Sequence, residues 1–191
     1  MGHVWVRQGI PGLFRVGKPL TADSRGSFHK ILCDLPLDMK ILEFDEIYWS
    51  ESEQGVIRGM HLQIPPFHGR KLVFATQGVV RDFVLDLRAG SPTFHKTWET
   101  ELTQASPGVL IPAGCAHGFI VEKGPAVLVY AQEGPYNQQF DTGVNINSIG
   151  LAGLSPDGVN SERDQQLPPL VEFNSPFIFD VLDYPGWKCE L

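Results

Sequence analysis

The sequence predicts a mainly β protein, built as a sandwich or barrel of short strands with only minor helices. Twenty Gly and fifteen Pro are spread through the 191 residues. They divide the chain into short runs that are rich in β-branched, aliphatic and aromatic residues, and about ten of these runs have the composition of strands. Helical periodicity is nearly absent, so the layers of the fold are expected to be sheets.

The predicted strands follow one another along the chain, with Gly, Pro, Asp or Ser between them. The runs at 80–87 and 97–102 alternate apolar and polar residues, as half-buried antiparallel strands do. One helical turn is expected at 161–166, where Ser161 can cap it. The full set of predicted strands is 13–16, 28–33, 40–49, 56–62, 71–76, 79–87, 95–102, 108–111, 118–122 and 126–132.

Composition describes one globular domain over residues 1–191. Hydrophobic residues make up 42% of the chain and charged residues 19%. No apolar run approaches the roughly 20 residues of a membrane span, and the N-terminus lacks the pattern of a secretory signal. The cysteines Cys33, Cys115 and Cys189 form neither a metal-binding spacing nor a disulfide framework. We therefore expect a cytoplasmic protein with reduced thiols and no membrane partner.

The net charge of −7 argues against nucleic acid as a partner, because a phosphate backbone requires a broad basic face. The basic residues are nevertheless concentrated locally. Arg58, Arg70 and Lys71 fall within one stretch, and Arg25 lies in an Asp-Ser-Arg-Gly turn. This arrangement suits a small phosphorylated ligand.

Polar side chains crowd the stretch 56–73 beside a strand pattern, which indicates a site. Strict alternation places Arg58 and Met60 on one face of the strand, and Gly59 and His61 on the other, enclosed face. A histidine there can act as a general base. A single inward histidine is, however, more often a hydrogen-bonded core residue or half of a metal site.

A second histidine, His117, follows a Pro-x-Gly turn and is expected near His61, because neighbouring strands of a jelly roll face one cavity. Two histidines in a β-barrel cavity often bind a metal. Here the segment after His61 lacks a His-x-His pattern, no Glu follows at the usual interval, and Lys71 would add a positive charge. These features argue against a metal. Covalent hydrolysis is set aside, because no Ser or Cys lies in a nucleophile elbow.

Proton abstraction next to a carbonyl fits these residues better, because it needs a base, an electrophilic partner for the enolate oxygen and an acid. His61, Lys71 and a tyrosine could fill these roles, and Tyr130 ends an alternating run. Asp164 could orient the histidine through its second ring nitrogen.

A series of short motifs extends over about residues 20 to 170. They are Arg25-Gly26-x-Phe28, Ser50-x-Ser52, Gly55-Val56-Ile57-Arg58-Gly59-Met60-His61-x-Gln63-x-Pro65-Pro66, Lys71-Leu72-Val73, Gln77-Gly78-Val79-Val80-x-Asp82, Asp86-Leu87-Arg88-x-x-Ser91-Pro92-Thr93-Phe94, Ile111-Pro112-x-Gly114-x-Ala116-His117-Gly118-Phe119, Tyr130, Tyr136 and Ser161-Glu162-Arg163-Asp164. Together they resemble the dTDP-4-dehydrorhamnose 3,5-epimerase family. The resemblance implies a cupin-type jelly-roll β-sandwich that is dimeric, requires no metal or cofactor, and epimerises a nucleotide-linked 4-keto-6-deoxy sugar.

The resemblance also implies roles for individual positions. His61 would be the base, with Asp164 as its orienting partner. Tyr130 would be the acid on the opposite side of the sugar ring, and Lys71 would stabilise the enolate oxygen. The implied substrate-binding positions are Arg25 and Arg58 at the diphosphate, Tyr136 stacked on the nucleotide base, His117 at the substrate, Arg163 near the nucleotide, and Phe28, Glu46, Tyr48, Gln63 and Asp141 elsewhere along the ligand.

The chain departs from the family pattern at several positions. Lys30 replaces an acidic residue, His68 replaces Gln, and Glu46 and Tyr48 replace Gln and Asn. Residues 143–148 replace the usual stretch after the stacking tyrosine. The chemistry is expected to be retained, with inversion at C5, and inversion at C3 as well is left open. Two alternatives stay open: a mono-epimerase acting on a CDP- or GDP-linked sugar, and a sugar-binding cupin without catalysis.

A homodimer is expected as well. Long strands expose edges that must be covered, and the run 13–16 could pair across a two-fold axis.

Overall fold

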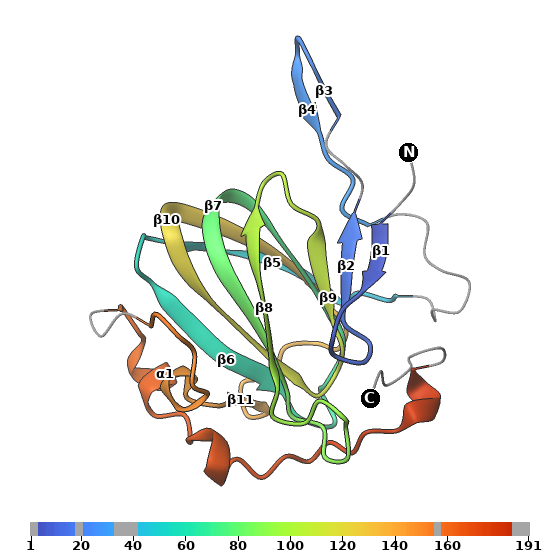
Figure 1. Cartoon of the computed structure of the whole chain (residues 1–191), viewed down its shortest axis with the longest axis vertical. Coiled ribbons are helices and arrows are strands. Elements are labelled where there is room, and N and C mark those ends of the chain that lie inside the picture. Colours follow the sequence, from blue (N-terminus) through green and yellow to red (C-terminus); the bar gives the residue numbers. More distant parts are fainter. Residues whose placement is uncertain (1–3, 18–20, 33–41, 155–157, 185–191) are drawn as a thin grey trace.

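The computed structural model describes residues 4–17, 21–32, 42–154 and 158–184. Within these ranges the chain forms one nine-stranded sheet network and a separate two-stranded hairpin (Figure 1). The described helical turns are short and follow the last strand. The expectation of a mainly β, cupin-type jelly roll with minor short helices is confirmed.

The elements follow one another in a simple order, with all strands before all helical turns. They are β1 (Val4–Arg7), β2 (Phe14–Gly17), β3 (Thr21–Asp23), β4 (Gly26–Phe28), β5 (Glu46–Ser52), β6 (Ile57–Gln63), β7 (Lys71–Asp86), β8 (Thr97–Thr103), β9 (Gly108–Ile111), β10 (Cys115–Gln132), β11 (Asp141–Gly143), η1 (Ile146–Ser148), α1 (Glu162–Gln165), η2 (Leu170–Glu172) and η3 (Val181–Asp183).

Two long strands, β7 and β10, hold the network together. They pair with each other from Cys115 opposite Asp86 to Gln132 opposite Lys71. On its other edge β7 pairs first with β9 and then with β8, while β10 pairs first with β6 and then with β5. One layer therefore runs β8-β7-β10-β6-β11, and the other runs β1-β2-β9-β7-β10-β5. Register shifts along the β7–β10 pair accompany the bend from one layer to the other.

The main core lies between the two layers, and a second apolar cluster lies outside the first layer. Val80 and Val84 of β7 point into the main core, whereas Phe83 and Leu85 belong to the outer cluster, which residues of 144–154 and 170–177 cover. The prediction that 80–87 is half-buried is therefore wrong, because β7 is covered on both faces. The alternation predicted for 97–102 is confirmed in β8, because one face of this strand is more exposed than the other.

Strand breaks that were predicted at glycine and proline explain most differences between the predicted and the observed strand boundaries. The predicted runs 71–76 and 79–87 belong to one continuous strand, β7. The runs 118–122 and 126–132 likewise belong to one continuous strand, β10. The gap in the first pair contains Gly78, which takes φ +76° within β7 as an irregularity rather than as a chain reversal. The three- and four-residue strands β1, β3 and β11 were not predicted, because such short runs carry little pattern.

Three predicted strands near the N-terminus need correction. The run 28–33 is wrong within the described residues, because β4 ends at Phe28 and no strand follows over 29–32. The run 40–49 is a strand only from Glu46 onward; residues 33 and 40–41 lie outside the described residues. The run 13–16 is a strand but not a sheet edge, because β2 pairs with β1 on one side and β9 on the other.

A bulge in β6 changes which side chains share a face. Phe119 of β10 pairs with Arg58, and His117 pairs with His61, so two steps along β10 oppose three along β6. Arg58 and His61 consequently line the same cavity, while Met60 packs into the outer cluster. The alternation that grouped Arg58 with Met60 is therefore wrong.

Gly59 occupies the bulge because no larger residue fits there. Its φ is +114°, and a Cβ at this position would lie 2.5 Å from the Gly118 Cα and 2.7 Å from the His117 carbonyl oxygen. A glycine inside a strand pattern often marks such a close backbone approach.

Gly59→Ala is expected to lower the free energy of unfolding by about 3 kcal/mol or more, because backbone strain adds to a clash with backbone atoms. Urea denaturation measures this loss. Gly55→Ala is the matched control: Gly55 has φ +83° but open space around its Cβ position, so only about 1 kcal/mol should be lost. Equal losses in the two variants would contradict the close-approach explanation.

Candidate active site

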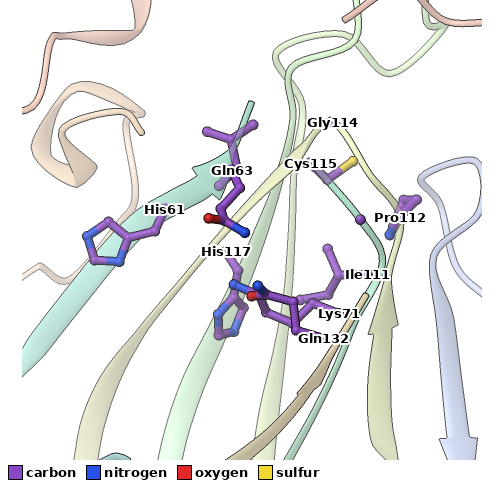
Figure 2. Close-up of a pocket in the computed structure, with 11 residues that line it drawn as sticks. His61, Gln63, Lys71, Ile111, Pro112, Gly114, Cys115, His117 and Gln132 are labelled. Atoms are coloured by element: carbon purple, nitrogen blue, oxygen red, sulfur yellow. The ribbon is translucent and has the colours of Figure 1, made fainter. Parts of the chain in front are cut away.

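The inner face of the jelly roll contains a cavity of about 790 Å³. Its walls come from β5, β6, β7 and β10, and its mouth is bordered by the loop after β10 and by α1. A recess of about 20 Å³ shares five lining residues with it. Figure 2 shows the side chains of Gln63, Lys71, His117 and Gln132 gathered there, with His61 on the same strand as Gln63.

His61 and Asp164 form a hydrogen-bonded pair at one wall. The His61 Nε2 lies 2.7 Å from Asp164 Oδ1, and the Gly59 amide donates to Asp164 Oδ2 at 3.2 Å. Burial alone would raise the pKa of Asp164, but the hydrogen bond from His61 and its charge, helped by the Gly59 and Ser161 contacts, hold that pKa below its ordinary value. Asp164 is therefore an ionised partner, and the second His61 ring nitrogen is left for other contacts.

A capped helical turn, α1, places Asp164 next to β6. Ser161 caps α1 by accepting a hydrogen bond from the Asp164 amide at 3.1 Å, and this fixes the start of a single helical turn. The predicted turn at 161–166 is thus confirmed. Asp164 itself is only 5% exposed and lies behind His61 rather than in the cavity wall.

A second histidine–carboxylate pair lies deeper in the cavity. His117 stands directly opposite His61 in the β10–β6 register, as expected, and its Nε2 lies 2.6 Å from Asp82 Oδ2. Both side chains are buried. The second Asp82 oxygen is buried and has no hydrogen-bond partner within the described residues. Asp82 therefore holds the ring of His117 at the cavity wall.

Lys71 is the first residue of β7 and faces the same cavity. Burial lowers the pKa of its ammonium group, and the negative charge of Asp141 partly opposes that shift. No carboxylate in the described part of the chain forms an ion pair with Lys71, so its ammonium is free to meet a ligand oxygen.

Tyr130 is buried in the cavity wall on β10, where it pairs with Tyr48 of β5. The two rings stack with centroids 4.9 Å apart and planes 14° from parallel. The Tyr130 hydroxyl lies 3.2 Å from Ser50 Oγ. Burial raises the pKa of Tyr130 well above its ordinary range, although the Ser50 contact opposes the shift. The phenol therefore keeps its proton at neutral pH.

Charged and aromatic groups surround the mouth of the cavity. The Arg58 Nε donates to Ser52 Oγ at 2.9 Å and leaves much of the guanidinium exposed. On the other side, Arg163 donates to Asp141 Oδ2 at 2.6 Å, next to the half-exposed ring of Tyr136. Cations and an aromatic ring at one opening suit a ligand that combines phosphate with a planar base.

Most of the predicted site residues line this cavity, but three do not: Asp164 lies behind His61, and Arg25 and Phe28 lie elsewhere. Arg25 and Phe28 lie on the β3–β4 hairpin, which projects away from the body of the chain (Figure 1). The Arg25 side chain is 88% exposed and pairs with Asp23, and Phe28 is 62% exposed. Within one chain they make no contact with the cavity. The predicted residues that line it are Glu46, Tyr48, Arg58, His61, Gln63, Lys71, His117, Tyr130, Tyr136, Asp141 and Arg163.

Sequence reasoning missed several residues of the site. Asp82 was not assigned a role, although it shares the inward face of β7 with Val80 and Val84. Ser50, Gln132 and Asp45 line the cavity too, and only the strand alternation could have indicated the first two.

Within the described residues, no group of three or more His, Cys, Asp or Glu side chains is placed to hold a metal ion. His61 and His117 each bond to a separate carboxylate instead. No helix in the described ranges has the length and apolar character needed to span a membrane.

Known proteins match this chain in both sequence and structure. The profile of the dTDP-4-dehydrorhamnose 3,5-epimerase family matches residues 7–172. A dTDP-4-dehydrorhamnose 3,5-epimerase from Sinorhizobium fredii is 33% identical over 157 residues, which are 78% of this chain and 80% of that protein. A dTDP-4-dehydrorhamnose 3-epimerase from Streptomyces niveus is 34% identical over 172 residues, 86% of this chain and 82% of that protein.

A solved structure adds agreement in fold. The dTDP-4-dehydrorhamnose 3,5-epimerase from Bacillus anthracis, which has TDP and PPi bound, superimposes with a TM-score of 0.82 at 27% identity. The match covers 88% of this chain and 100% of that chain. The resemblance that the sequence motifs indicated is therefore confirmed, and the chain belongs to the dTDP-4-dehydrorhamnose 3,5-epimerase family.

Proposed function

We propose that the protein inverts C5 and C3 of a dTDP-linked 4-keto-6-deoxy sugar by removing the proton next to the ketone and returning a proton to the opposite face. The family consists of epimerases, so the chain is an isomerase. The observation that carries the proposal is the placement of the His61–Asp164 pair and of Tyr130 on different strands around one cavity. Epimerisation requires a base and an acid in such an arrangement.

His61 acts as the base in this proposal. Its Nε2 is engaged by Asp164, so the lone pair of Nδ1 is left to accept the substrate proton. Asp164 fixes the orientation of the ring and stabilises the imidazolium that forms. The low pKa of Asp164 supports this role, because the carboxylate stays charged across the neutral range.

Lys71 stabilises the enolate. When the proton leaves carbon, negative charge moves to the ketone oxygen, and a cation in a dry cavity lowers the energy of that state. Lys71 has no described ion-pair partner that would compete for its charge. His117 lines the same cavity, and Asp82 holds its ring.

Tyr130 is the acid on the other face of the sugar. Its raised pKa keeps the hydroxyl protonated at neutral pH, and Ser50 holds the oxygen. Arg58 holds the diphosphate, Arg163 lies near the nucleotide, and the ring of Tyr136 stacks on the nucleotide base. Glu46, Tyr48 and Asp141 border the ligand along the same wall.

We also propose that the protein is a cytoplasmic homodimer. The exposed hairpin with Arg25 and Phe28 cannot reach the cavity of its own chain, yet the family motif includes both residues. A second copy supplies them if its hairpin extends over this cavity, so that Arg25 meets the diphosphate. The free thiol of Cys115 fits a reducing compartment.

A mono-epimerase is the second candidate. The 3-epimerase from Streptomyces niveus is as similar to this chain as the 3,5-epimerases are. The two reactions share the same base and acid, so only the positions of deuterium incorporation distinguish them.

Tyr130→Phe is expected to uncouple proton removal from inversion. The variant keeps the ring and its stack on Tyr48, so His61 should still exchange the substrate proton for deuterium. Inversion should fall by about 100-fold or more, because the acid is lost. NMR in deuterium oxide measures both rates. Tyr184→Phe, the same change at a ring that does not line the cavity, should alter neither. Equal loss of exchange and inversion in Tyr130→Phe would show that Tyr130 is not a dedicated acid.

The homodimer can be tested by mixing two defective chains. Arg25→Ala should lower kcat/KM by about tenfold or more, because it removes charged hydrogen bonds, and His61→Ala should be nearly inactive. Co-expression of the two should restore about a quarter of the sites. With random pairing about half of the dimers are mixed, and each mixed dimer contains one intact site out of two. Co-expression of His61→Ala with Lys71→Ala should restore none. Failure of the first mixture to regain activity, or a monomer in light scattering, would contradict the shared site.

A further inference from the structure

The backbone that carries Tyr136 is held by side chains from the strands that build the site. Tyr136 belongs to the loop 133–140, which connects β10 to β11, and it is 52% exposed. An exposed ring on a loop usually has few contacts that restrain it. In this loop, however, side-chain hydrogen bonds hold four consecutive residues, 134–137.

Two acidic residues at the start of β5 hold two of these backbone positions. Asp45 Oδ2 accepts a hydrogen bond from the Gly134 amide at 2.6 Å. Glu46 Oε1 accepts one from the Tyr136 amide at 2.9 Å. Bonds to an ionised acceptor are stronger than those between neutral groups, so these amides are firmly held.

Gln63, the last residue of β6, holds the other two positions and a second loop. Its Oε1 accepts from the Asn137 amide at 2.6 Å. Its Nε2 donates to the Pro135 carbonyl oxygen at 3.3 Å and to the Phe67 carbonyl oxygen at 3.0 Å. A glutamine amide has two N–H donors, and both are used here. The side chain is also 9% exposed, so it has no donor left for a ligand.

We propose that Gln63 is a positioning residue that acts on the ligand through Tyr136 instead of contacting it. Gln63 lies two residues after His61 and lines the same cavity, so it fixes the loop relative to the strand that carries the base. A loop that is ordered before binding loses less conformational freedom when the ligand arrives, and affinity is higher. This inference rests on the proposed function, because it takes Tyr136 as the ring that stacks on the nucleotide base. It replaces the expectation that Gln63 binds the substrate directly.

Gln63→Met tests the proposal, because it removes all three hydrogen bonds, keeps the length of the side chain and adds no charge. Calorimetry should show about tenfold weaker binding of dTDP, and KM should rise similarly with kcat nearly unchanged. Amide hydrogen exchange over 134–140 should accelerate in the absence of ligand. Gln138→Met makes the same change at an exposed side chain of the same loop and should alter none of these quantities.

A double-mutant cycle separates positioning from direct contact. In a Tyr136→Ala background, Gln63→Met should cause no further loss of dTDP affinity, because the loop no longer carries the ring. An equal loss in both backgrounds would overturn the proposal, as would unchanged hydrogen exchange of the loop or a fall in kcat at constant KM. A wild-type protein that neither binds dTDP nor turns over the keto sugar would refute the proposed function, whereas the exchange measurement would still decide whether Gln63 holds the loop.

Discussion

The antiparallel pairing of β7 with β10 is the constraint on which the site depends. These strands continue through both layers, and they bring Lys71 and Asp82 from one strand beside His117 and Tyr130 from the other. The remaining strands of the site then pair with β10, so that β6 presents its histidine and β5 presents Tyr48. Because residues distant in sequence are fixed through ladders of backbone hydrogen bonds, their relative positions depend little on any single side chain.

The electrostatic arrangement follows from burying polar groups in pairs. Each cavity histidine has its own carboxylate, whereas Lys71 is left without one among the described residues. An unpaired ammonium in a partly buried cavity is costly until a ligand supplies negative charge, and burial has already lowered its pKa. The cavity is therefore complementary to a state in which negative charge develops on a bound oxygen. The family to which the chain belongs uses a keto sugar, in which the enolate oxygen would carry that charge.

Much of the fold could be predicted from the sequence, because glycine and proline punctuation and apolar runs mark strands directly. The pairing of His61 with His117 followed from the expectation that neighbouring strands of a jelly roll face one cavity. Other features could not be predicted from the sequence, because they depend on contacts between distant segments. The bulge at Gly59 shifts the alternation by one residue and depends on the approach of Gly118 from a distant strand. The position of Arg25 depends on a hairpin that leaves the body of the chain. The hydrogen bonds of the Gln63 side chain depend on a loop 70 residues away or more.

The central claim is that His61 removes the proton next to the ketone. The most direct test compares wild-type protein with His61→Ala, each incubated with dTDP-4-keto-6-deoxyglucose in deuterium oxide and followed by NMR. The wild type should incorporate deuterium at C5 and C3. The variant should do so at least about 100-fold more slowly at both carbons, because no neighbouring group replaces the base. Deuterium incorporation by His61→Ala at the wild-type rate would contradict the account.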